Sequence, residues 1–325
     1  MKKIVVLGHG VGVKLIIDTL LTQNNLESRV VALVTHPLEG HQRDIEMIEN
    51  RKEMYGEFAY NVFNVEKDYN IPVFTASNVN ELSSISYIKS FTPDYIISVG
   101  CRDIIKKEFL REFSGRVFNI HTTPLPRYRG AASDSWMILN GEWGKDLFGV
   151  FHEIDEGIDT GRIVAKSQYS IPNKSYPIDV FKSRMSIFPD LIEKAFSALN
   201  SSSINFEEQD HYEATTFPRL FTPKDGRIDF KLFDGVSIER FIYAFGYPFE
   251  GAYCFLGECK INILEADFIE GASMHPKTYG LVFGRDKDGN YKVSVNGGSL
   301  LIKKIERNNQ TINQSEVMRL GRILN

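Results

Sequence analysis

The sequence predicts an α/β protein: a doubly wound, mostly parallel, Rossmann-like sheet followed by a small antiparallel β domain. Short runs of apolar, β-branched residues alternate with helix-like stretches through the first half of the 325-residue chain, as in sheets that are buried on both faces. After Ser201 the pattern changes to closely spaced short strands separated by turn residues, which is typical of antiparallel sheets.

The strands of the first half are continuous apolar runs. Lys3–Gly8 and Val30–Thr35 are the clearest, and the series continues with 71–76, Tyr95–Gly100, Arg116–His121 and Phe148–Ile154. Helices are expected over Val13–Thr22, part of Ile45–Tyr69, Asn80–Phe91, Asp103–Phe113 and Ile178–Leu199. This alternation predicts parallel strands that are joined by crossover helices.

The second half carries hairpin signals. Asp286–Asn290 (DKDGN) and Asn296–Gly298 (NGG) are turn sequences between short strand-like runs. We expect a small antiparallel, barrel-like domain from about residue 212 to 310, and a short helix within Gln314–Asn325. The chain is accordingly divided into an α/β domain, 1–205, and a β domain, 206–325.

Composition and charge exclude several classes of protein. Apolar residues at 42% and charged residues at 25% are ordinary globular values. A net charge of -4 and a pI of about 6.0 favour no nucleic-acid partner. The three cysteines form no CxxC pair, which suits a reducing compartment and argues against a cysteine metal site. No apolar run approaches the roughly 20 residues that cross a membrane, so a cytoplasmic protein with no membrane partner is expected.

The glycine-containing turn after the first strand has two interpretations. Gly8, Gly10 and Gly12 lie where dinucleotide-binding loops do, but their spacing is not G-x-G-x-x-G. The second strand ends in LVTHP, without the acidic residue that binds a ribose hydroxyl, so no NAD is expected. A tight strand-to-helix turn is the simpler interpretation, and such a turn can still contact a substrate.

The most informative stretch is FNIHTTPLPRYRG, residues 118–130. Asn119 and His121 are two apart on a strand, so their side chains point to the same side of the sheet. Prolines then end the strand and stiffen the following loop. Alone, His121 would be read as a core histidine and Asn119 as a strand-end cap.

A second polar stretch, HEIDEGIDTG at 152–161, follows another apolar strand. Alone, it is a solvated acidic loop, with Gly157 and Gly161 allowing a compact turn. Beside His121, one of its carboxylates could fix the histidine tautomer and raise its basicity. An amide donor for an oxyanion, a histidine for a proton and a carboxylate together suit acyl transfer to an amine. No serine or cysteine elbow is present, so direct transfer is the simpler scheme.

These two stretches resemble the transferases that use N10-formyltetrahydrofolate. NIHTTPLPRYRG is similar to the Asn-x-His strand end and Arg-Gly loop of that family, and DEGIDTG is similar to its acidic loop. The resemblance implies that Asn119, His121 and Asp159 are the catalytic residues. It also implies the formyltransferase fold. Thr122-Thr123-Pro124 departs from the Ser-Leu-Leu type of sequence often found there, so the loop that covers the folate differs.

The second half of the chain narrows the resemblance. The methionyl-tRNA enzymes and the sugar-nucleotide enzymes of this family share a C-terminal domain, and two stretches resemble it: PKDGRIDF at 223–230 and YPFEGAYCFLG at 247–257. The second stretch is most like the enzyme that formylates UDP-4-amino-4-deoxy-L-arabinose. The implied activity is N-formylation of a nucleotide-linked amino sugar, a 4-amino sugar for lipopolysaccharide or another surface glycan. Methionyl-tRNA formylation and non-catalytic folate or nucleotide binding stay open as alternatives.

The resemblance also implies ligand contacts and partners. N10-formyltetrahydrofolate is the expected co-substrate, with contacts from Val99, Cys101, Arg102, Ile104, Leu125, Ile154, Asp155 and Ile158. The acceptor is expected at Gly8, His9, Gly10 and Arg127. No metal is expected. The expected partner is a small molecule rather than a nucleic acid, and a homodimer is the expected assembly.

Overall fold

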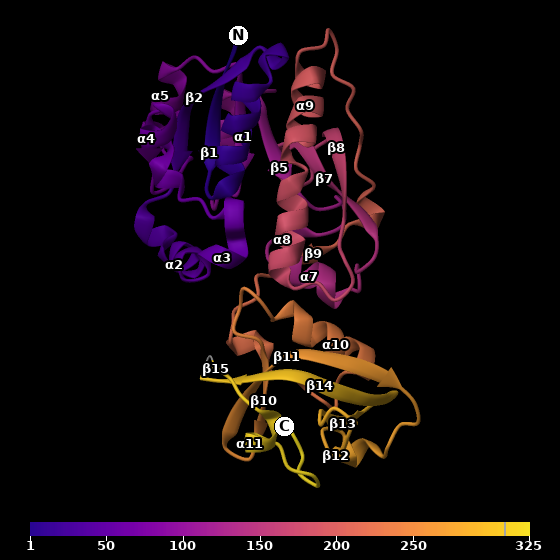
Figure 1. Ribbon diagram of the computed structural model, residues 1–325. Helices are drawn as coiled ribbons and strands as arrows, with labels where there is room; N and C mark the ends of the chain where they lie inside the picture. The colour runs from indigo at the N-terminus through magenta and orange to yellow at the C-terminus, as the bar shows by residue number, and fades with distance from the viewer. Residues whose placement is uncertain (309) are drawn as a thin grey trace. The chain divides into compact units, whose positions relative to one another are not determined.

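The computed structural model describes residues 1–308 and 310–325, which separate into two compact units (Figure 1). Unit 1 consists of Met1–Ala131, Asp146–Ser170 and Lys182–Phe217. Unit 2 consists of Ala132–Lys145, Ile171–Phe181 and Pro218–Asn325. The sequence predicts a boundary between two domains at residues 205 and 206. That boundary stays a prediction.

Unit 1 is built on a seven-stranded sheet with the order β3-β2-β1-β4-β5-β7-β8. The first five strands in this order are parallel, whereas β7 and β8 run antiparallel to their neighbours. The strands are β1 (Lys2–Gly8), β2 (Ser28–Thr35), β3 (Val73–Thr75), β4 (Tyr95–Val99), β5 (Val117–His121), β7 (Asp146–Glu153) and β8 (Ile163–Ser170). The predicted mostly parallel, doubly wound sheet is confirmed.

Both faces of this sheet are covered by helices because the central strands are apolar on both sides. Val5 and Leu7 pack in a core with side chains of α5 (Leu82–Ser90) and α6 (Lys107–Glu112). Ile4 and Val6 point the other way and are fully buried. On that side α1 (Val11–Thr22) and α9 (Phe188–Leu199) lie side by side (Figure 1).

The turn after β1 needs glycine because two backbones approach closely there. A Cβ at Gly8 would lie 1.8 Å from the carbonyl oxygen of Val99 at the end of β4. Gly10 has a φ of 77°, which L side chains rarely adopt. These contacts agree with the simpler interpretation of the motif, a tight strand-to-helix turn.

Several predicted helices differ in extent. The helix expected over Ile178–Leu199 is two helices, α8 (Pro177–Ser186) and α9, with a Pro189 at the start of the second. The helix expected from Asp103 begins only at Lys107. The region 45–69, where helix is expected over part of the length, contains most of α2 (Gln42–Asn50) together with α3 (Lys52–Tyr55) and α4 (Val65–Tyr69). The break between α8 and α9 falls at Ile187, which is itself apolar and buried, so helical periodicity does not register it.

A short two-stranded ladder completes unit 1. β6 (Arg129–Gly130) pairs in parallel with β9 (Thr216–Phe217). The second strand belongs to residues 206–217, here called the strap, which lie within the predicted β domain, 206–325. The strap also bridges to β8, where Ile163 and Glu207 exchange backbone hydrogen bonds of 2.8 Å.

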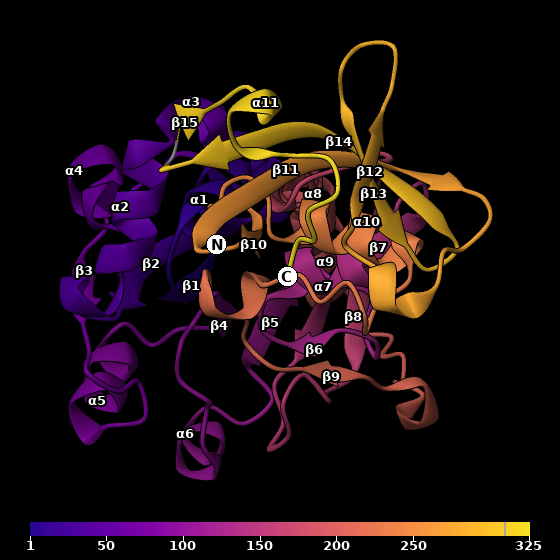
Figure 2. The same cartoon turned by 90° about the horizontal axis from the view of Figure 1, so that it is seen from below.

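Unit 2 is an antiparallel sheet, as predicted (Figure 2). Its strand order is β10-β11-β14-β13-β12, and β15 pairs with β14. Among the described residues the end strands β10 and β12 do not pair with each other, so the sheet is open and the predicted barrel-like closure is not found. The expected turns 286–290 and 296–298 join β12 to β13 and β13 to β14. The strands are β10 (Ala252–Leu256), β11 (Cys259–Glu270), β12 (Val282–Arg285), β13 (Tyr291–Val295), β14 (Gly298–Arg307) and β15 (Gln310–Thr311).

Among the described residues, the helices that lie wholly within unit 2 accompany its sheet. They are α7 (Ser133–Leu139), α10 (Gly235–Ala244) and α11 (Gln314–Val317). The helix α11 is the short helix expected near the end of the chain, and Asn313 and Glu316 cap it reciprocally. Among the described residues, no helix has both the length and the apolar character needed to cross a membrane.

Candidate active site

Asn119 and His121 lie on β5, where the sheet changes from parallel to antiparallel pairing. Both side chains are partly exposed, in contrast to the buried Phe118 and Ile120 between and beside them. In the antiparallel pairing with β7, Asn119 lies opposite His152 and His121 lies opposite Val150. Directly opposite residues point to the same face, so His152 joins the predicted pair.

A hydrogen bond between Asn119 and His152 defines the orientation of both side chains. His152 Nδ1 lies 2.7 Å from the backbone carbonyl oxygen of Glu153. A carbonyl oxygen can only accept, so Nδ1 carries the proton and Nε2 is an acceptor. Asn119 Nδ2 lies 3.1 Å from that Nε2 and therefore donates to it. The same amide nitrogen has a second N–H, which is the kind of donor that stabilises a developing oxyanion.

His121 is oriented by the loop that follows its own strand. Its Nε2 lies 3.0 Å from the carbonyl oxygen of Tyr128 and donates to it. Nδ1 is then the basic nitrogen of the neutral ring, and it lies 3.8 Å from Asp159 Oδ2. The sequence suggests that a carboxylate fixes the tautomer of His121. In the structure the Tyr128 carbonyl does so instead, and Asp159 does not. Asp159 is placed to stabilise the ring once Nδ1 gains a proton.

Asp159 lies in a tightly folded loop between β7 and β8. Its φ is 53°, an uncommon value for a residue with a Cβ. Its carboxylate accepts a 3.1 Å hydrogen bond from the backbone N–H of Gly130, and it also lies 3.8 Å from His152 Nε2. At Gly161 a Cβ would lie 2.0 Å from the carbonyl oxygen of Glu153, so the loop closes tightly on its own strand. The predicted residues Asn119, His121 and Asp159 are therefore brought together. His152 lies between Asn119 and Asp159.

The stability of the protein is expected to fall on acidification because of His152. Burial lowers the pKa of this histidine from 6.5 to about 4, although Asp159 opposes the shift. The unfolded state then binds more protons than the folded state between these pH values, so stability is complete above pH 6.5 and is lost as the pH falls toward 4. The loss from this one residue should be about 3 kcal/mol, and urea unfolding at a series of pH values measures it.

A matched variant isolates this contribution from those of other titrating groups. His152→Gln cannot gain a proton, so its unfolding free energy should depend less steeply on pH over the same range. Burial also lowers the pKa of His9 to about 4 and that of His41 to about 3, so a weaker slope persists in the variant. Identical slopes in the two proteins would show that His152 is not buried as an uncharged ring.

Of the eight residues expected to contact folate, seven fall on two segments, 99–104 and 154–158, and Leu125 lies in the loop after β5. Val99 ends β4 and is buried, and Cys101 packs on the core, where burial raises its thiol pKa to about 11. Arg102 is paired with Asp44 at 2.8 Å, whereas Ile104 is 61% exposed. In the first segment the accessible apolar side chain is therefore Ile104. The neighbouring Arg102 already has a carboxylate partner in Asp44.

The second segment surrounds Asp159. Ile154 packs on the core, Asp155 accepts a 3.0 Å hydrogen bond from the N–H of Gly157, and Ile158 is 50% exposed. Leu125 is only 1% exposed and packs in a small core cluster with Val150 and Ile163. Its side chain is therefore part of the support beneath the site, and its assignment to folate stays a prediction.

The residues expected to contact the acceptor lie at the carboxyl end of β1 and in the loop after β5. Gly8 and Gly10 form the turn described above, and the His9 N–H donates to the Val99 carbonyl oxygen at 3.1 Å. The guanidinium of Arg127 lies over the Tyr128 ring, 5.6 Å from its centroid. Arg129, in the same loop, is buried and donates to Gln209 instead of facing solvent.

His9 also belongs to a group of possible metal ligands. Ligand atoms of His9, His41 and Asp44 all lie within 4.8 Å of one another. However, the two imidazole rings are stacked 3.4 Å apart with 3° between their planes. A ring nitrogen binds a metal along its in-plane lone pair, so two parallel stacked rings cannot direct both lone pairs at one ion. In this arrangement the group is not a metal site, and the absence of a metal stays a prediction.

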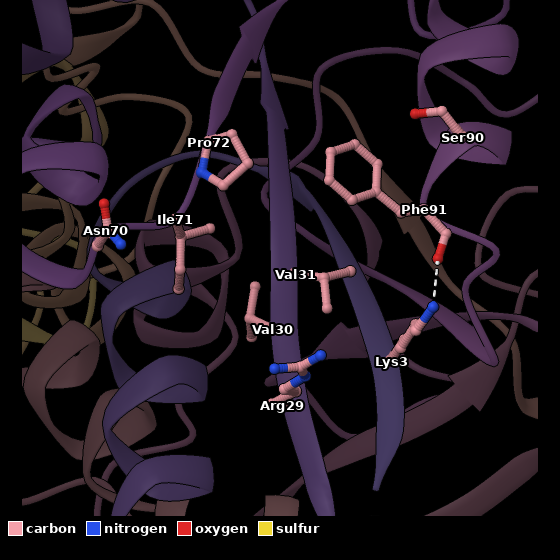
Figure 3. A pocket seen from close by; sticks show the side chains of 9 residues that line it. All are labelled: Lys3, Arg29, Val30, Val31, Asn70, Ile71, Pro72, Ser90 and Phe91. Atoms are coloured by element: carbon pink, nitrogen blue, oxygen red, sulfur yellow. Dashed lines mark hydrogen bonds between the residues drawn. The ribbon is translucent and has the colours of Figure 1, made fainter.

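A pocket lies at the opposite end of the parallel strands, near their amino ends. It has a volume of about 420 Å³ and is lined by the amino ends of β1 and β2, the residues before β3 and the end of α5. Figure 3 shows Lys3 in this pocket donating to the Phe91 carbonyl oxygen. None of the predicted site residues lines it. The chemistry-bearing side chains are instead gathered at the carboxyl ends of the strands, where ligands bind in open α/β sheets.

Comparisons with known proteins identify the family of the chain. Residues 2–185 match the family described as Formyl transferase, and residues 221–320 match Formyl transferase, C-terminal domain. A methionyl-tRNA formyltransferase of Clostridioides difficile (strain 630) is 27% identical over 241 residues, which are 74% of this chain and 75% of that protein.

Two solved structures are similar in fold over nearly their full length. One is WlaRD, a sugar 3N-formyl transferase crystallised with dTDP and 5-N-formyl-THF, with a TM-score of 0.62, 19% identity, and coverage of 96% of this chain and 98% of that one. The other is an N-formyltransferase from Helicobacter canadensis in complex with folinic acid and dTDP-3-aminofucose, with a TM-score of 0.62, 19% identity, and coverage of 93% and 99%. Because the first family match spans more than half of the 325 residues, this chain belongs to the formyl transferase family and is a formyl-transferring enzyme.

Proposed function

We propose that this enzyme moves a formyl group from N10-formyltetrahydrofolate to the primary amine of a nucleotide-linked amino sugar. The observation that carries the proposal is the cluster of Asn119, His121 and Asp159, with His152 holding the Asn119 amide. The product would enter a surface glycan such as lipopolysaccharide. The sequence resemblance favours a 4-amino sugar, whereas the two structural neighbours are 3-amino sugar enzymes or bind a 3-amino sugar.

The residues of the cluster take separate roles in this reaction. As the amine adds to the formyl carbon, the formyl oxygen gains negative charge, which the second N–H of Asn119 stabilises. His121 accepts the proton that the amine loses, at Nδ1, and Asp159 stabilises the resulting imidazolium. The carbonyl then re-forms as the bond from the formyl carbon to N10 breaks, and N10 takes up the proton held on His121, which returns the histidine to its neutral form. No covalent enzyme intermediate is needed.

The surroundings of the cluster fit a folate. Lys107 and Glu156 form an ion pair of 2.9 Å that joins the segment after β4 to the loop that carries Asp159. The exposed side chains of Ile104 and Ile158 belong to these two joined segments. Exposed apolar side chains on two joined segments are suitable contacts for the faces of a flat ring such as a pteridine.

Charge favours a small acceptor over tRNA. A tRNA carries one negative charge per phosphate, and proteins that bind it present clustered basic residues. The chain has a net charge of -4, and of the basic side chains near the site Arg102 is paired with Asp44 and Arg129 is buried. Methionyl-tRNA formylation is the second candidate because the curated relative at 27% identity has that activity.

A formylation assay tests the proposal directly. Purified enzyme is supplied with N10-formyltetrahydrofolate and either a panel of UDP-, dTDP- and GDP-linked 3- and 4-amino sugars or aminoacylated initiator tRNA. Release of tetrahydrofolate with a sugar nucleotide, and none with tRNA, is the expected result. The Asp159→Asn variant serves as the control for uncatalysed transfer.

Other outcomes would decide against the proposal in different ways. Formylation of tRNA alone would assign the enzyme to the second candidate function. Folate binding by calorimetry without transfer to any acceptor would favour a binding protein, in which the cluster has lost its catalytic use.

A further inference from the structure

We infer that Gln209, in the strap of residues 206–217, is a positioning residue that holds Asp159 in its working orientation. This inference rests on the proposed function, since it gives Gln209 a role only through the catalytic carboxylate. The strap lies outside both motifs that identified the site. Its contacts nevertheless converge on the loop of Asp159 and on the loop after β5.

Gln209 is buried, with 6% of its surface exposed, and its amide nitrogen faces the loop between β7 and β8. Gln209 Nε2 donates to the backbone carbonyl oxygen of Asp159 at 2.9 Å and to that of Gly161 at 2.7 Å. Both N–H groups of the amide are therefore used on carbonyls that flank Thr160. An amide that serves two carbonyls of one short turn restricts the backbone on both sides of that turn.

Arg129 ensures that the amide of Gln209 points in this direction. Arg129 Nη2 donates to Gln209 Oε1 at 2.7 Å, and it also lies 2.9 Å from His211 Nδ1 on the same strap. A guanidinium has donors only, so the oxygen of Gln209 must face Arg129 and the nitrogen must face the loop. Arg129 is 8% exposed, so this pair is shielded from water.

The Asp159 backbone needs such support because its φ of 53° is uncommon for a residue with a Cβ. Its carboxylate is held from the other side by the N–H of Gly130, which belongs to β6. That strand is itself paired with β9 of the strap. The strap therefore holds Asp159 both through its backbone carbonyl and through the partner of its carboxylate.

The strap also supports the group that orients His121. The Tyr128 N–H donates to Thr215 Oγ1 at 3.0 Å, and the Arg129 N–H donates to the Thr215 carbonyl oxygen at 3.0 Å. The Tyr128 ring is stacked on Phe217 with centroids 5.4 Å apart. The Tyr128 carbonyl, which accepts from His121 Nε2, is thus fixed by the same segment.

Gln209→Glu tests the inference with little change in volume. The new carboxylate keeps the pairing with Arg129 but cannot donate to the Asp159 and Gly161 carbonyls. We expect kcat to fall about 10- to 100-fold, since small displacements of catalytic groups have effects of this size. The KM for N10-formyltetrahydrofolate and the affinity for 5-formyltetrahydrofolate should stay within about 3-fold, which would not hold for a site that had collapsed. Gln209→Leu, which also lacks the donors, is the second variant should the first not fold.

Two readouts separate positioning from a merely structural role. Amide hydrogen exchange in the peptide 153–161 should become faster in Gln209→Glu, and this measurement needs no acceptor. The second readout is the split between turnover and binding, because kcat should fall while the affinity for 5-formyltetrahydrofolate stays within about 3-fold. Glu208→Gln, an exposed neighbour on the strap, is the matched control and should leave exchange, kcat and this affinity unchanged.

The outcomes distinguish this inference from the proposed function. Normal kcat and normal exchange in Gln209→Glu, with an inactive Asp159→Asn, would overturn the role of Gln209 and leave the catalytic cluster intact. An active Asp159→Asn would overturn the catalytic role of the carboxylate itself. Slow turnover with faster exchange in Gln209→Glu and unchanged behaviour in Glu208→Gln would support the inference.

Discussion

Replacing either Asn119 or His121 with alanine is expected to lower kcat for formyl transfer by at least about 100-fold. Asn119→Ala removes the donor that would stabilise the charged formyl oxygen, and it also leaves the buried His152 Nε2 without its partner. His121→Ala removes the nitrogen that would accept the amine proton. The measurement is single-turnover transfer to the acceptor found in the panel assay.

Binding of folate should survive both changes, because the exposed apolar residues and loop backbones are untouched. Calorimetry with 5-formyltetrahydrofolate is therefore expected to give nearly the same affinity for both variants. Asn24→Ala and His275→Ala, which change the same residue types at exposed positions, are the matched controls and should retain full activity. Near-normal turnover in Asn119→Ala and His121→Ala would remove the basis of the proposed mechanism.

Phe151→Ala is expected to destabilise unit 1 by about 3–5 kcal/mol, the largest effect on stability that we predict. Phe151 lies on β7 with its side chain fully buried, and its ring is stacked on Phe118 of β5 with centroids 5.1 Å apart. Removing the ring leaves a cavity between the two strands that carry the catalytic cluster. Urea unfolding followed by circular dichroism measures the loss.

The same strands serve core and site on opposite faces, which explains why this packing matters for activity. Phe151 and His152 are consecutive, so they point to opposite sides of the sheet. Phe151→Leu keeps part of the packing and should lose less stability, whereas Tyr212→Ala removes a fully exposed ring and should lose less than about 0.5 kcal/mol. A small effect of Phe151→Ala would show that β5 and β7 are held together mainly by their backbone pairing.

Local patterns were sufficient for much of the fold and for part of the site. The apolar runs Lys3–Gly8 and Val30–Thr35 predicted buried parallel strands because a strand covered on both faces has no polar side to vary. Alternation alone placed Asn119 and His121 on one face of β5. The grouping of Asp159 with them came from a family resemblance and not from spacing, since it lies 38 positions after His121 in the chain.

Other parts of the site could not be read from local pattern. His152 follows a buried phenylalanine and precedes an acidic residue, which is also the pattern of an ordinary strand end. Its role depends on β7 lying antiparallel beside β5, where it faces Asn119. The periodicity that predicted one helix over 178–199 likewise gave no sign of the break at Ile187, because both halves bury apolar faces.

The sequence by itself determined the fold class, the hairpin turns of the second half and the two motifs that carry the chemistry. These depend on side-chain alternation, on apolar runs and on turn residues, which act over a few neighbouring positions. Only the tertiary structure decided which ring nitrogen of His121 and of His152 carries the proton, and which residues hold Asp159 in place. Tyr128, Glu153 and Gln209 do this through carbonyl and amide groups, whose partners are chosen by how distant segments meet in space.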